Sequence, residues 1–233
     1  MKFNSITSGD GLVQDIDFLC HTNSANYPLI DKARNINNWY RKAVSWIREV
    51  PSDWEYDDSN HTTLPIYTST LVHNQQDYEL QSTAQRIRRV EILDSSGNYI
   101  LLDPIDSEEI GTATSEYYET AGLPQYYDLV GRSVMLYPKP SSADVTTTAG
   151  IKIYVDRDIV EFESTDTTAV PGFSSSFHRI LSLGAAFDFE GDPTQKNYLL
   201  GQIRELKSEV QNFYVSRHKE GRTQIKPRRQ NYR

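Results

Sequence analysis

The strongest constraint on this chain is a change of hydrophobic period along the sequence. Both ends carry helical spacing, and the middle carries short strand-like runs. A first helix is predicted over residues 11–21, from apolar side chains that share one face (Leu12, Ile16, Leu19). A second is predicted over residues 28–50, from a longer stripe (Leu29, Ala33, Ile36, Tyr40, Ala43, Ile47). Pro28 suits the first turn, and Pro51 ends the helix because proline disfavours helical geometry in the residue before it.

Between about residues 64 and 162 the sequence becomes rich in β-branched and aromatic residues, which is typical of strands. Strands are predicted at residues 66–72, 77–80, 87–93, 99–102, 126–130, 134–137 and 151–155. The polar run 94–98 contains Gly97 and predicts a hairpin turn, because glycine accepts the positive φ that such turns need. Residues 106–109 predict a capped helical turn.

Helical spacing returns near the C-terminal end. A helix is predicted over residues 174–189, where Gly184, Ala185 and Ala186 would let another helix approach closely. Asp192 is a suitable N-cap for the last helix, with Pro193 in its first turn. Gln195 lies where a capping box would place it.

The last helix carries a regular apolar seam, in which five side chains alternate by four and three positions (Leu199, Ile203, Leu206, Val210, Phe213). The first explanation for this seam is the core of a helical bundle, and the second is an oligomer interface.

The predicted fold class is α+β, with a helical bundle built from both ends of the chain and an inserted antiparallel β-domain. The expected boundaries are 1–62 for the N-terminal helices, 63–165 for the β-insert and 166–216 for the C-terminal helices. Residues 217–233 form an extended basic tail. With seven basic residues and Glu220, this tail has a net charge of +6. The rest of the chain has 17 basic and 31 acidic residues, a net charge of −14, so the tail is expected to dock on an anionic partner.

The sequence gives little sign of catalysis, and no enzyme, cofactor or metal site is expected. It has no phosphate-binding loop, no nucleophile elbow and no metal-binding histidine spacing. Cys20 is the only cysteine and is expected to be a buried apolar side chain; neighbouring His21 points about 100° away on a helix. Acidic pairs such as Asp15/Asp17, Asp57/Asp58 and Glu108/Glu109 are expected by chance among 32 acidic residues. His178 is expected to be a satisfied core or interface histidine.

Membrane insertion is not expected, because no apolar run approaches the roughly 20 residues that a membrane-spanning helix needs. The first residues also lack the apolar core of a signal peptide. A single free thiol fits synthesis in a reducing cytoplasm.

The middle and C-terminal parts of the chain resemble the head-to-tail adaptor (connector) proteins that sit beneath the portal of tailed bacteriophages. The similarity spans about residues 67–213 and lies in the order of the segments and in the kinds of residue that they contain. The segments that carry it are 86–93, 122–131 (Gly-Leu-Pro-Gln-Tyr-Tyr-Asp-Leu-Val-Gly), 134–140, 170–173, 177–181 and 184–186.

This resemblance implies a virion protein of the phage neck that forms a ring, expected to be dodecameric. The ring would bind the portal protein above and a tail or stopper protein below, with DNA passing through its lumen without sequence-specific binding. It also implies that the C-terminal segment reaches into the portal. The side chains expected to make that contact are Arg217, Lys219, Arg222, Lys226, Arg228, Arg229, Tyr232 and Arg233.

Three other functions remain open from the sequence. The chain could be another neck or tail component, such as a stopper, tail terminator or collar protein. It could be a carbohydrate- or receptor-binding module built on the β-insert, since 15 Tyr and 3 Trp offer stacking surfaces; the alternative is that these aromatic side chains are core residues. A nucleic-acid binder would use the basic tail, and its binding would fall steeply with salt.

Overall fold

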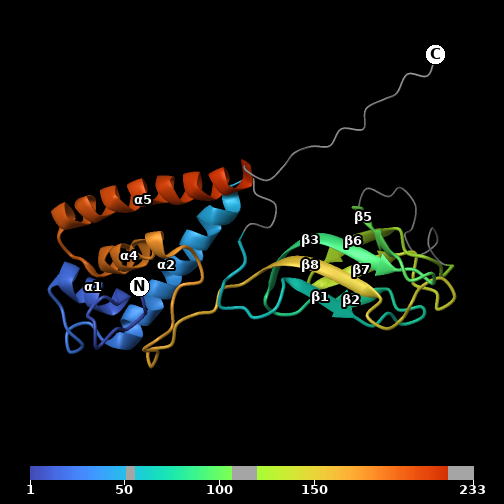
Figure 1. The fold of residues 1–233 in the computed structure, drawn as a ribbon, viewed down its shortest axis with the longest axis horizontal. Helices are drawn as coiled ribbons and strands as arrows, with labels where there is room; N and C mark the ends of the chain where they lie inside the picture. Colours follow the sequence, from blue (N-terminus) through green and yellow to red (C-terminus); the bar gives the residue numbers. More distant parts are fainter. Residues whose placement is uncertain (51–55, 107–119, 220–233) are drawn as a thin grey trace, which may run out of the picture. The chain divides into compact units, whose positions relative to one another are not determined.

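The computed structural model describes residues 1–50, 56–106 and 120–219. The chain divides into two compact units, seen in Figure 1. The helical unit comprises Met1–Asn60 and Ile159–Arg233, and the β unit comprises His61–Asp158. The expected insert, 63–165, therefore extends beyond the C-terminal end of the β unit at Asp158, because Ile159 and Phe162 pack in the core of the helical unit. No helix in the described part of the chain is long and apolar enough to cross a membrane.

The helical unit contains the four helices expected from the spacing of apolar residues. Their bounds are α1 Leu12–Cys20, α2 Leu29–Glu49, α4 Arg179–Phe189 and α5 Pro193–Lys219. The helix expected over 174–189 instead begins as a short 3₁₀ turn, Ser175–Phe177, before α4 starts. Pro28 lies just outside α2 as its N-cap, with extended backbone, rather than in the first turn.

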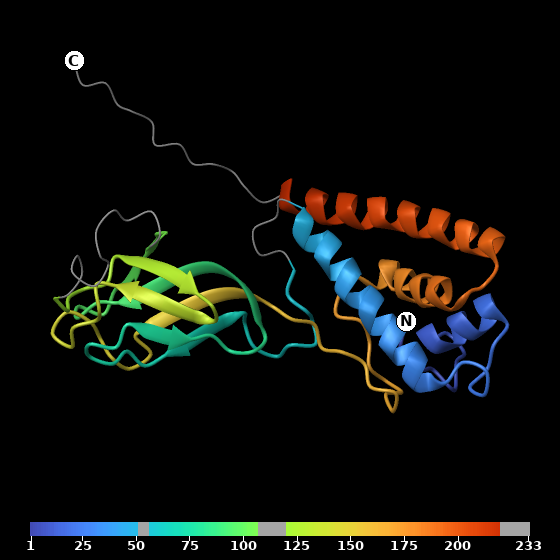
Figure 2. The ribbon, with the colours of Figure 1, turned by 180° about the vertical axis from the view of Figure 1, so that it is seen from behind.

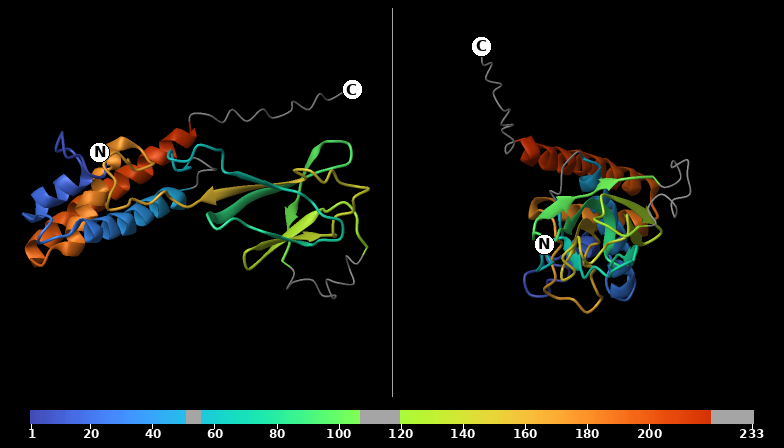
Figure 3. Two further views of the ribbon diagram at one scale, coloured as in Figure 1. Left: turned by 90° about the horizontal axis from the view of Figure 1, so that it is seen from below. Right: turned by 90° about the vertical axis from the view of Figure 1, so that its right-hand side faces the viewer.

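Helix α4 is the centre of this unit, since it packs against α1, α2 and α5 (Figures 1 and 2). The left view of Figure 3 shows blue α2 and orange-to-red α5 in the same unit, and these two helices also pack together. Gly184 of α4 permits the approach of α2, because a Cβ at that position would overlap the Trp39 indole. The close approach expected from the small residues 184–186 is therefore confirmed at Gly184.

The start of α5 follows the predicted cap in part. The Asp192 carboxylate accepts a hydrogen bond from the Thr194 backbone N–H at 3.1 Å, as an N-cap should. The predicted capping box was wrong. In it, the Gln195 side chain would accept the Asp192 N–H, but this N–H donates to Glu190 Oε1 at 3.0 Å. The Glu190 side chain reaches back from the end of α4 and takes that place.

The described residues of the β unit form two four-stranded sheets (Figure 1). One has the order β1-β8-β3-β4 and is antiparallel throughout (Ile66–Ser69, Ile151–Arg157, Ala84–Leu93, Tyr99–Leu101). The other has the order β2-β7-β6-β5 (Asp77–Glu79, Ser133–Tyr137, Tyr126–Val130, Asp103–Pro104). Its strands are antiparallel except that β5 pairs parallel to β6.

One apolar core lies within the β unit, and both sheets contribute to it. Val90 and Ile92 of β3 are fully buried there with Val134 and Leu136 of β7. The predicted hairpin is confirmed: the Asp94 carboxylate accepts N–H bonds from Ser96 and Asn98, and Gly97 has a φ of 84°. Of the turn predicted at 106–109, residues 107–109 lie outside the described residues.

Candidate interaction surfaces

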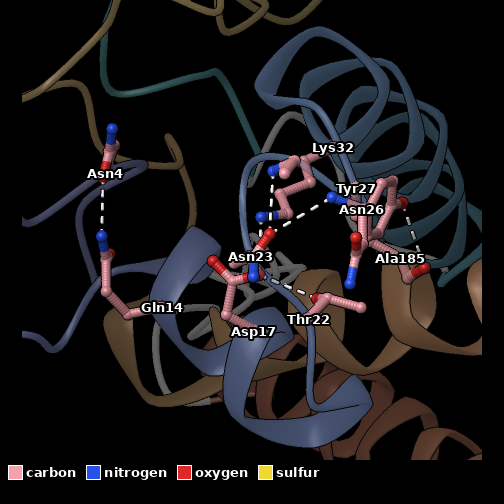
Figure 4. A network of polar contacts seen from close by, with 10 residues as sticks. Asn4, Gln14, Asp17, Thr22, Asn23, Asn26, Tyr27, Lys32 and Ala185 are labelled. Carbon is pink, nitrogen blue, oxygen red and sulfur yellow. Dashed lines mark hydrogen bonds and ion pairs between the residues drawn. The ribbon is translucent and has the colours of Figure 1, made fainter.

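A buried ion pair joins the first two helices of the helical unit. Lys32 of α2 is fully buried, and its Nζ lies 2.6 Å from Asp17 Oδ1 of α1 (Figure 4). The same carboxylate oxygen accepts a hydrogen bond from the Thr22 hydroxyl at 2.8 Å. A buried ammonium is costly unless it is paired, so this contact holds α1 against α2. The Asp15/Asp17 pair expected by chance thus includes a structural carboxylate.

A second buried cluster lies where the chain leaves and re-enters the helical unit. Asp58 is buried and accepts hydrogen bonds from the Tyr40 hydroxyl at 2.8 Å and from the Val160 N–H at 2.9 Å. The Tyr40 oxygen in turn accepts the Gly172 N–H. Burial, followed by the Asp58 charge, raises the pKa of Tyr40 above its ordinary value. Three chain segments are therefore fixed around one carboxylate and one neutral phenol.

His178 is a core histidine, as expected. Its side chain is buried, Nε2 lies 2.8 Å from the Phe173 carbonyl oxygen, and Nδ1 lies 2.8 Å from the Met1 nitrogen. Burial lowers the pKa of the imidazole, which favours the neutral form. Both ring nitrogens are thus committed to backbone groups.

Cys20 is half-buried, and its Sγ lies 3.8 Å from the Ala186 carbonyl oxygen. Burial is the main reason that the pKa of this thiol rises to about 11. An activated nucleophile requires the opposite shift.

The Asp15 carboxylate accepts a hydrogen bond from the Ser182 hydroxyl and lies 3.7 Å from Arg179. Among the described residues there is no group of three or more His, Cys, Asp or Glu side chains placed to hold a metal ion.

Most of the predicted seam of α5 faces the core of its own unit. Leu199, Ile203 and Val210 are buried there, and Leu206 is half-buried against it. Phe213 remains 36% exposed, with its ring edge-on to Phe177 at a centroid distance of 5.3 Å.

All the predicted portal-binding side chains lie outside the described residues. Arg217 and Lys219 belong to the last turn of α5, and their side chains lie outside the described residues. The remaining members of the set also lie outside them (Arg222, Lys226, Arg228, Arg229, Tyr232, Arg233).

Two of the three tryptophans considered for a binding surface on the β-domain belong to the helical unit. Trp39 and Trp46 are in α2, and the third, at position 54, lies outside the described residues.

One surface that the sequence reasoning missed is a row of lysines lying over aromatic rings, here called the basic flank. Lys42 Nζ is 4.0 Å from the Trp39 ring centroid, and Lys207 Nζ is 4.9 Å from that of Trp46. Lys196 lies 5.4 Å from the Phe187 centroid. Among the described residues none of these lysines forms an ion pair.

A second missed surface is a groove of about 170 Å³ between α4 and α5, here called the acidic flank. Its charged residues are Glu205 and Glu209 of α5 and Arg179 of α4, which is already paired with Asp15. Its other lining residues are Leu183, Gln202 and Leu206. The i,i+4 spacing of the two glutamates was the sequence signal for this face.

Comparison with curated protein sequences gives no match. A family model described as SU10 adaptor protein, by contrast, matches residues 12–223, so it covers α1, the β unit and all of α5. Because the match extends over most of the 233 residues, the chain belongs to the SU10 adaptor protein family, a family of phage adaptor proteins.

Proposed function

We propose that this protein is the head-to-tail adaptor of a tailed phage. Copies of the chain form a ring beneath the portal, join the capsid vertex to the tail, and leave a central passage for DNA. The ring meets the portal on one side and a tail or stopper protein on the other. The observation that carries this proposal is the family match over residues 12–223.

The distribution of charge supports the proposed contact with the portal. The basic residues of 217–233 give this segment a net charge of +6, against −14 for the rest of the chain. A charged segment that meets an acidic surface sets the register and the association rate of a complex. In this proposal the C-terminal segment is the part of the chain that docks on the portal.

The negative charge of residues 1–216, here called the acidic body, supports a passive role toward DNA. A net charge of −14 outside the tail repels phosphate groups, so DNA slides through the ring rather than adhering to it.

Removal of the tail tests the docking contact. Portal binding is measured by surface plasmon resonance for the full chain, for a chain ending at Ser216, and for a full-length chain with the seven basic tail residues replaced by Gln. The full chain should bind, and both variants should bind at least tenfold more weakly. Unchanged binding by both variants would assign docking to another surface. A full chain that does not bind the portal would overturn the adaptor proposal itself.

A further inference from the structure

The basic and acidic flanks lie on opposite sides of α5. Lys196 and Glu205 are nine residues apart, which is about two and a half turns of an α-helix, so their side chains leave the helix in opposite directions. Lys207 and Glu209, two residues apart, also point to different sides. Between the two flanks, the buried residues Leu199, Ile203 and Val210 face the core.

The lysines of the basic flank and the glutamates of the acidic flank form no ion pair with other described residues. In the described part of the chain, neither Glu205 nor Glu209 takes part in an ion pair. Gln202 Oε1, in the same groove, is a buried acceptor with no hydrogen-bond donor among the described residues. In the described part of the chain the ammonium groups of the basic-flank lysines lie over aromatic rings, an attractive placement for a cation, and none of them forms an ion pair.

The acidic flank also offers apolar contact area at its margins. Tyr198, one turn before Gln202 on α5, is 58% exposed, and Phe213 is 36% exposed. Leu183 and Leu206 line the groove between them. A partner surface that brings both ammonium groups and aromatic rings would match this combination, and the basic flank presents Lys42, Lys196 and Lys207 beside Trp46 and Phe187.

We propose that the basic flank of one copy docks on the acidic flank of the next copy. Two different, complementary patches on one subunit form a head-to-tail interface, which generates a ring when the rotation closes. This inference rests on the proposed function, and it names the surfaces through which the adaptor binds itself. In this arrangement the ammonium groups of Lys42 and Lys207 meet the carboxylates of Glu205 and Glu209.

Charge reversal on each flank tests the proposal. The basic-flank variant is Lys42→Glu/Lys207→Glu, and the acidic-flank variant is Glu205→Lys/Glu209→Lys. Ser208→Glu changes an exposed position of α5 between the two flanks and is the matched control. Circular dichroism and thermal melting of each variant verify that the helical unit is folded. Assembly is measured by native mass spectrometry, alone and with the portal.

Wild-type chain and the Ser208→Glu control should form rings. Each flank variant alone should lose assembly, because every interface would then bring like charges together. An equimolar mixture of the two variants should recover rings that contain both in a 1:1 ratio. Folded flank variants that assemble separately like the wild type, or a mixture that stays unassembled, would overturn the interface. If the wild type itself neither assembles nor joins the portal, the proposed function fails together with it.

Discussion

At the scale of single residues, the packing of α2 on α4 depends on the absence of a side chain at Gly184. A Cβ there would overlap the Trp39 indole, so Gly184→Ala should lower the free energy of unfolding by about 1–3 kcal/mol through overpacking. Gly201 in α5 is the matched control, because a Cβ at that position meets no atom within 4 Å. Gly201→Ala should raise the free energy by up to about 1 kcal/mol. Urea denaturation measures both; a neutral Gly184→Ala would show that the helices can separate at no cost.

Cys20 gives a prediction about pH. Burial raises the pKa of its thiol from 9.0 to about 11, so the protonated form is favoured by folding. Stability from this group is complete below pH 9 and is lost as the pH rises from 9 to 11. At pH 9 the native thiolate fraction should be roughly 50-fold below that of the unfolded chain. Iodoacetamide should therefore label native protein far more slowly than protein in urea, and equal rates would contradict the burial of this side chain.

At the scale of elements, the start of α5 is fixed by the carboxylate of Asp192. Asp192→Ala removes the acceptor for the Thr194 N–H and should cost about 1 kcal/mol of stability. Asp192→Asn retains a capping oxygen and should cost only a small part of that. Thermal melting of the two variants distinguishes the cap from a general effect of losing one negative charge: equal losses would assign the effect to the charge.

The positions of helices and most strands could be predicted because each carries its own apolar period, as the α2 stripe does. Strand β5 could not, since it has only two residues, one of them a proline, and its pairing partner β6 supplies the rest of the information. Strand β3 begins at Ala84, earlier than expected. Register shifts between Ala84 and Arg86 and between Ile87 and Arg89 break the alternation from which its first residues could have been predicted. Such irregularities depend on the neighbouring strand β8.

The candidate surfaces were harder to predict than the elements. The basic flank gathers lysines and rings from α2, α4 and α5, and more than a hundred residues of the sequence separate α2 from α4. Its existence depends on how those helices pack, because the spacing within α2 or within α5 shows only the part of the flank that lies on that helix. The seam of α5 could be predicted from the sequence because all of its members lie on one helix.

At the scale of the whole molecule, the acidic body predicts weak interaction with DNA. The net charge of −14 outside the tail should keep duplex DNA from being retained by the assembled ring at physiological salt. Fluorescence anisotropy with a labelled duplex measures this, and the isolated basic segment 217–233 provides a positive control. A tight grip by the ring that does not change with salt concentration would contradict a passive DNA passage.

The central claim, that this chain is the ring-forming adaptor of the portal, is tested most directly by native mass spectrometry of the full chain mixed with its cognate portal. The account predicts a single complex in which a complete ring of adaptor copies joins one portal in a fixed ratio. A chain that remains monomeric and leaves the portal free at all mixing ratios would contradict it.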